Sequence, residues 1–106
     1  GGDTSAQVKA RGAAARQIQA DRYRDHGPHR VNADASGALL EEVAAPDDAG
    51  RALIHKAAER LGLTARGYHR ILRSARTIAD LEASDKVHSH HLAEAISYRL
   101  PFVAGG

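Results

Sequence analysis

Apolar residues recur at the period of an α-helix along most of this chain. The clearest stretch is 48–61, where apolar residues recur once per helical turn, singly or in adjacent pairs: Leu53, Ile54, Ala57, Ala58 and Leu61. Asp47 precedes this stretch at an N-cap position, and Gly62 follows it where a left-handed C-cap belongs. A second amphipathic stretch begins after Thr64 and extends to about Ala83. We predict one helix over each stretch.

A first helix is predicted near the N-terminus, with a cap at Asp3, Thr4 or Ser5. It extends to about residue 25 and ends before Gly27-Pro28, because proline cannot continue the helical hydrogen bonds. Its apolar face is thin and consists of Val8, Ala15 and Ile18. So thin a face indicates that this helix docks on a partner surface.

Two more helices complete the predicted set. The stretch 35–44 is short and stops before Pro46. A last helix is expected to be capped by Ser89 and closed by Pro101, with these apolar positions facing inward: Leu92, Ala93, Ile96 and Leu100. The fold class is therefore all-α, a small bundle of about five helices.

Composition supports a helical fold and a single domain. Alanine and leucine dominate the apolar positions, and both favour helices over strands. The 106 residues suffice for one modest core. We expect residues 1–2 to be a cloning remnant, 3–100 to form one domain in which 3–25 is a candidate docking helix, and 101–106 to form a tail.

The absence of cysteine excludes disulfides, thiolate metal ligands and cysteine nucleophiles. No apolar run approaches the roughly 20 residues that span a bilayer. We expect no signal peptide, because no continuous hydrophobic stretch follows the basic residues near the start of the sequence. A cytoplasmic protein without a membrane partner is expected.

The charged residues carry the strongest functional signal. Twelve of the 15 basic residues are arginine, the side chain best suited to forked contacts with phosphate. Four of them, Arg66, Arg70, Arg73 and Arg76, fall within an arc of roughly 120° on the second predicted helix, opposite its apolar side. No acidic residue interrupts this row before Asp80. The pattern predicts a cationic surface for an anion such as phosphate.

Arg66 is the most unusual member of the row. It lies in the first turn of its helix, where the helix dipole disfavours a cation and favours an anion. A bound anion would offset both the guanidinium charge and the positive end of the dipole.

Several segments of the chain also resemble a known family. The segment "LTARGYHRILRSARTIADL" (63–81) is the most specific, and "HLAEAISYR" (91–99) adds to it. Upstream, "ARQIQADR" (15–22) and Asn32-Ala33 fit the same pattern, whereas Gly12 stands where the family usually has valine. Together they resemble the C-terminal helical domain of the magnesium-chelatase-like AAA+ ATPases, of the ComM/YifB type.

The resemblance implies a lid domain beside a nucleotide site. Arg66 matches the sensor-2 arginine that reaches the γ-phosphate of ATP, and Arg70, Arg73 and Arg76 are candidates for further phosphate or subunit-interface contacts. The implied cofactors of the parent protein are ATP and Mg²⁺. The implied partners are an N-terminal AAA+ core of the same chain, the neighbouring subunits of a homo-oligomeric ring, and DNA.

Other readings of the sequence stay open. The chain has no G-x-x-x-x-G-K-[ST] loop, so this part alone is not expected to hydrolyse ATP. The arginine row could instead bind nucleic-acid backbone, or the domain could serve only in oligomerisation. No metal is expected at His88, His90 and His91, because their spacing does not place them on one helix face and no acidic partner is near in sequence.

Overall fold

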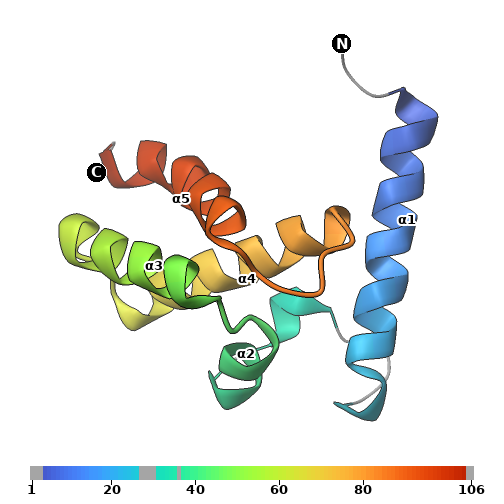
Figure 1. Ribbon diagram of the computed structural model, residues 1–106, viewed down its shortest axis with the longest axis horizontal. Helices are drawn as coiled ribbons and strands as arrows, with labels where there is room; N and C mark the ends of the chain where they lie inside the picture. The colour runs from blue at the N-terminus through green and yellow to red at the C-terminus, as the bar shows by residue number, and fades with distance from the viewer. Residues whose placement is uncertain (1–3, 27–30, 36, 105–106) are drawn as a thin grey trace.

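The computed structural model describes residues 4–26, 31–35 and 37–104, and these residues form an all-helical fold (Figure 1). The α-helices are α1 (Ser5–Arg22), α2 (Gly37–Val43), α3 (Asp48–Leu61), α4 (Ala65–Leu81) and α5 (Ser89–Ala104). Two short 3₁₀ helices, η1 (Arg24–His26) and η2 (Asn32–Asp34), lie between α1 and α2. The described residues contain no β-strand, only a single bridge between Pro46 and Val87. The predicted fold class is confirmed.

Helix α4 is the centre of the arrangement. It packs against α5, α1, α2 and η2, while α3 packs against α5. The core side of α4 carries Ile71, Leu72, Ala75 and Ala79, all buried. The other helices contribute Leu40, Ile54 and Leu92, which have no exposed surface. A helix that is covered on several sides provides a firm base for the side chains at its exposed first turn.

Three of the predicted helix starts are confirmed. Thr4 caps α1, Asp47 caps α3 and Thr64 caps α4, each through a side-chain oxygen that accepts a backbone N–H three residues later. Gly62 takes the left-handed conformation, with φ of 62°, as predicted for the C-cap of α3.

The first helix is shorter than predicted. It ends at Arg22 rather than near residue 25, because Tyr23 turns into the core, where it is 1% exposed and donates a hydrogen bond to Asn32 Oδ1 at 2.6 Å. The predicted stop signal Gly27-Pro28 and the expected remnant 1–2 lie outside the described residues.

Both ends of the last helix also differ from the prediction. Ser89 is the first helical residue rather than the cap. The cap position falls to His88, whose backbone N–H donates to Nδ1 of His91 at 2.9 Å. At the other end the helix continues through Pro101 to Ala104 rather than closing at Pro101. The loss of one backbone donor at a proline did not stop the last turn. The side chain of Leu100 and residues 105–106 lie outside the described part.

None of the described helices combines the length and the apolar character needed to cross a bilayer.

Candidate functional site

Arg66 occupies the exposed first turn of α4. The helix starts at Ala65, and the Thr64 hydroxyl accepts the Gly67 N–H at 3.1 Å, which fixes the direction of the turn. Arg66 is exposed, and no hydrogen bond or ion pair joins it to any other described residue. The first turn contains no acidic residue. The structure therefore presents a free guanidinium beside the positive end of the helix dipole.

Arg70 and Arg73 continue the row along α4, but they differ in exposure and in hydrogen bonding. Arg70 is exposed and has no partner among the described residues. Arg73 is half-buried, and its Nε donates to the carbonyl oxygen of Ala35 at 2.7 Å. Both arginines border an open hollow of about 480 Å³, lined by Ala33, Arg70, Arg73, Ser74, Thr77, Ile78 and Tyr98. No carboxylate is among these lining residues, so the hollow favours an anionic or neutral ligand over a cation.

Arg76 does not belong to the exposed row, and this prediction is wrong. The side chain is 3% exposed, and its two Nη atoms donate to the carbonyl oxygens of Val43 (3.3 Å), Asp85 (3.0 Å) and Ser84 (2.6 Å). Burial lowers the pKa of the guanidinium from its ordinary value. Arg76 joins the end of α2 to the turn between α4 and α5, and its role is structural.

Arg76 is buried because α4 is covered by other elements on more than its apolar face. The periodicity of α4 predicts one apolar face and one wet face. In the structure α1 and η2 also pack against α4, and the polar residues Arg76 and Asp80 are buried in its C-terminal half. The exposed row is thereby reduced to Arg66 and Arg70, with Arg73 at its edge.

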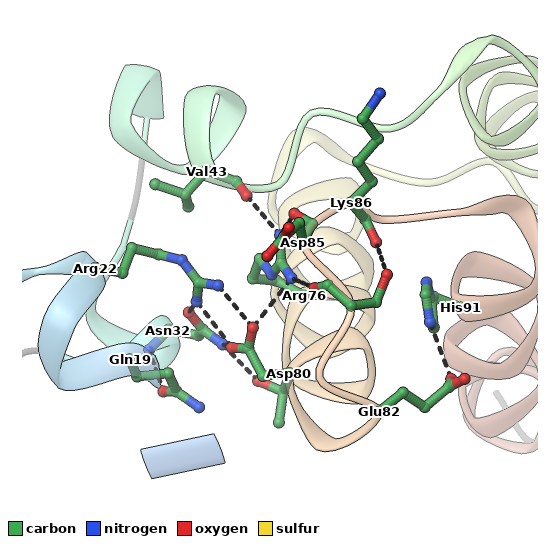
Figure 2. A network of polar contacts seen from close by, with 12 residues as sticks. Gln19, Arg22, Asn32, Val43, Arg76, Asp80, Glu82, Asp85, Lys86 and His91 are labelled. Carbon is green, nitrogen blue, oxygen red and sulfur yellow. Dashed lines mark hydrogen bonds and ion pairs between the residues drawn. The ribbon is translucent and has the colours of Figure 1, made fainter. Parts of the chain in front are cut away.

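The buried side of α4 contains a polar network centred on Asp80 (Figure 2). Asp80 is 1% exposed, and Arg22 of α1 binds its carboxylate with both Nη atoms, at 2.8 and 2.6 Å. Arg76 Nη2 lies 3.0 Å from the same carboxylate. The hydrogen bond and charge of Asp80 raise the pKa of Arg22 above its ordinary value. One carboxylate thus holds two guanidinium groups from two helices.

Asn32 of η2 completes this network. Its Nδ2 donates to Asp80 Oδ2 at 2.9 Å and to Thr77 Oγ1 at 3.0 Å, and its Oδ1 accepts from Arg22 at 3.1 Å. Its backbone N–H donates to Gln19 Oε1 at 2.9 Å. Every polar group of this buried asparagine therefore has a partner, which fixes its orientation.

The sequence did not reveal this network as a structural unit. Gln19, Arg22 and Asn32 all fell in the segments that resemble the family, but no role was predicted for them. A signal was present, since Ala15, Gln19 and Arg22 stand four and three residues apart and so share one face of α1. Polar residues in line with the apolar face of a helix indicate a buried polar contact.

The histidines after α4 are closer to an acidic residue than their spacing suggested. Glu82 Oε1 lies 3.3 Å from His90 Nε2, and Glu82 Oε2 lies 2.9 Å from His91 Nε2. The turn between α4 and α5 brings Glu82 back beside the start of α5, so an acidic partner is near in space although none was predicted from proximity in sequence. His91 is also fully buried rather than solvated.

The protonation of His91 argues against a metal ion in this cluster. Its Nδ1 accepts the His88 N–H, so the proton of the neutral ring is on Nε2, the atom that faces Glu82. A metal-binding histidine normally donates from its second nitrogen instead. Binding a metal at Nε2 of the neutral ring would move that proton to Nδ1, and Nδ1 could then no longer accept the His88 N–H. The cluster fits the capping of α5 better than a metal centre.

Comparison with known families identifies the class of protein. Residues 2–99 match the family described as the C-terminal domain of the magnesium chelatase subunit ChlI, and the chain therefore belongs to this family. The match covers α1 and the network as well as the arginine row on α4.

Its relatives are of the ComM and YifB type. The chain is 39% identical over 98 residues to competence protein ComM of Haemophilus influenzae, and 39% identical over 103 residues to YifB of Salmonella typhimurium. It is 38% identical over 98 residues to the protein Rv2897c of Mycobacterium tuberculosis. These matches cover 92% of this chain but only 18 to 19% of each relative, so the chain spans about a fifth of the length of the proteins that it matches.

Proposed function

We propose that this domain is the C-terminal lid of a magnesium-chelatase-like AAA+ ATPase, and that Arg66 is its sensor-2 arginine. Arg66 would contact the γ-phosphate of ATP that the AAA+ core of the same chain binds with Mg²⁺. The observation that carries the proposal is the position of Arg66: exposed, without a partner among the described residues, and in the first turn of α4. A γ-phosphate would supply the negative charge that this site lacks.

The rest of the domain suits a lid that carries such an arginine. Helix α4 is held from several sides, and Gly67 and Ile71, which follow Arg66, are buried. A guanidinium on a rigid helix reaches a phosphate with little loss of conformational entropy. Rotation of the whole lid would then bring the charge to the nucleotide or withdraw it, which couples hydrolysis to movement of a ring neighbour.

The exposed half of α1 is the proposed contact with the AAA+ core. Residues 5–14 contribute no buried side chain to this domain, and Val8 is 52% exposed. A helix with so little of its own surface covered gains stability when a second surface packs on it. In the parent protein that surface would be the preceding core.

Steady-state ATP hydrolysis by the parent-length protein tests the proposal. Arg66→Ala is expected to lower kcat by tenfold or more, which corresponds to about 1.4 kcal/mol or more in the barrier. Arg51→Ala is the matched control, because Arg51 is an exposed arginine near the start of α3. Circular dichroism of both variants establishes that the fold is retained. Equal turnover in wild type and Arg66→Ala would refute the sensor role.

A second candidate function is contact with nucleic-acid backbone. The observation in its favour is the hollow bordered by Arg70 and Arg73 that has no carboxylate among its lining residues. The two functions are compatible in a cytoplasmic motor that acts on DNA, with branched or single-stranded DNA as the proposed substrate and metal insertion into a porphyrin as the alternative. Binding of a fluorescent single-stranded oligonucleotide that weakens with salt in the wild type, with a log–log salt slope smaller by about one in Arg70→Ala, would support backbone contact.

A further inference from the structure

Helix α1 has two halves with different surroundings. Its C-terminal half packs against α4, with Ala15 and Gln19 buried. Its N-terminal half, residues 5–14, is exposed except for the partly covered Gly12, and the N-terminal end of the helix points away from the other helices (Figure 1). The exposed half is about 15 Å long, at a rise of about 1.5 Å per residue. The first helix is thus an arm that is attached at one end.

The attachment of this arm is both apolar and polar. Within α1 itself Ala15 is the only buried apolar residue among the described ones, and Tyr23, directly after the helix, is buried in the core at the attached end. The directional hydrogen bonds at this attachment come from Arg22, which binds both carboxylate oxygens of Asp80 at 2.8 and 2.6 Å and also donates to Asn32. A forked guanidinium–carboxylate pair restricts orientation more than apolar contact does.

The same network reaches α4 at a distance from its functional end. Asn32 binds Thr77 and Asp80 in the C-terminal half of the helix, whereas Arg66 stands at the N-terminal end. Fourteen residues separate Arg66 from Asp80 in sequence, which is about 21 Å along a straight helix. A rotation applied near Asp80 therefore displaces Arg66 by an amount that grows with this distance.

We propose that Arg22, Asn32 and Asp80 form a joint that makes α1 and α4 one rigid unit. Through this joint, displacement of the exposed half of α1 by the rest of the protein would turn α4 together with the lid helices packed on it, and so position Arg66. The three residues are proposed as positioning residues, since Asn32 and Asp80 are buried and the network lies at the opposite end of α4 from Arg66. The link to Arg66 rests on the proposed lid function, whereas the rigidity of the joint does not.

The rigidity is measured without any nucleotide. The chain has no cysteine, so spin labels can be placed at Ala13→Cys on α1 and Ser74→Cys on α4, both exposed positions outside the network. Double electron–electron resonance then gives the distribution of distances between the two helices. The joint variant is Arg22→Gln, which leaves Asp80 still paired with Arg76 and Asn32. The matched control is Arg24→Gln, since Arg24 is exposed and pairs only with Asp21 among the described residues.

We expect a narrow distribution in the wild type and in Arg24→Gln, and one at least twice as wide in Arg22→Gln with unchanged circular dichroism. Equal widths in all three proteins would overturn the proposal. If Arg22→Gln does not fold, Arg22→Lys replaces it, because lysine keeps the charge but loses the forked contact. The distribution in Arg22→Lys is then expected to be wider than in the wild type, and an unchanged width would again overturn the joint.

Turnover by the parent-length protein tests the link to Arg66. Arg22→Gln is expected to lower kcat at least fivefold with KM for ATP changed less than twofold, while Arg24→Gln keeps both values. Unchanged kcat in Arg22→Gln, together with a large loss in Arg66→Ala, would overturn the coupling and leave the lid function intact. Unchanged kcat in Arg66→Ala would instead remove the lid function and the coupling with it, whatever the spin-label result.

Discussion

Replacement of the Asp80 carboxylate is expected to be among the most damaging single changes in this domain. In Asp80→Asn, Arg22 loses its forked partner and the buried Arg76 loses its ion pair. Arg76 keeps its hydrogen bonds to backbone carbonyls. The guanidinium groups of Arg22 and Arg76 would then lie close together with no carboxylate between them to balance their charge. The structure thus predicts an uncompensated charge in a buried position.

The magnitude follows from that imbalance. Removal of one partner of a buried ion pair costs about 3 to 5 kcal/mol. A domain of this size has a free energy of unfolding of about 5 to 15 kcal/mol, so the variant would lose a large part of its stability. With an m-value of about 1.5 kcal/mol/M, a loss of 3 kcal/mol lowers the urea midpoint by about 2 M.

The assay is equilibrium unfolding in urea, followed by circular dichroism at neutral pH. Asp85→Asn is the control, because this side chain is exposed and only its backbone carbonyl binds Arg76. The control is expected to stay within about 0.5 kcal/mol of the wild type. A change below about 1 kcal/mol in Asp80→Asn would refute the reasoning that this carboxylate balances two buried cations.

Three further predictions follow from single sites. Gly50→Ala is expected to lower the melting temperature, because a Cβ there would lie 2.8 Å from Leu92 Cδ1. Gly67→Ala is expected to keep or raise the melting temperature, because its Cβ would meet only contacts of 3.6 Å or more. A lower melting temperature in Gly67→Ala than in Gly50→Ala would contradict the packing described for these two positions. Burial lowers the pKa of His91, so the unfolded chain takes up a proton first as the pH falls, and stability should decline below about pH 6.5. His91→Gln should reduce this decline between pH 7.5 and pH 5, measured as urea midpoints, and an unchanged decline would assign it to other groups. Val8→Asp should leave the free energy of unfolding of the domain within about 0.5 kcal/mol of the wild type but lower ATP turnover of the parent-length protein, and normal turnover would argue against docking through α1.

The helices were predictable because their signals are local. Thr64 and Asp47 cap helices through residues three positions away, and Gly62 ends α3 through its own backbone conformation. Such contacts are encoded within one turn of sequence, so pattern and turn chemistry suffice to find them. The signal that ends α1 is not local, because it depends on the burial of Tyr23 and its hydrogen bond to Asn32.

The candidate site was predictable only in part, because some of its residues depend on contacts between distant segments of the chain. The exposure of Arg66 and Arg70 follows from the period of α4. The burial of Arg76 depends on α2 and on the turn after α4, and the role of Arg22 depends on Asp80, 58 positions later in the chain. Contacts between distant segments need the tertiary arrangement, which hydrophobic periodicity does not contain.

The most direct test of the central claim is a structure of the parent-length protein with a non-hydrolysable ATP analogue and Mg²⁺. The measured quantity is the distance from the Arg66 guanidinium nitrogens to the γ-phosphate oxygens. Our account predicts a charge-assisted hydrogen bond of about 2.7 to 2.9 Å in the closed state of the lid. An Arg66 side chain that points to solvent or to another protein surface in every subunit, with the nucleotide bound, would contradict it.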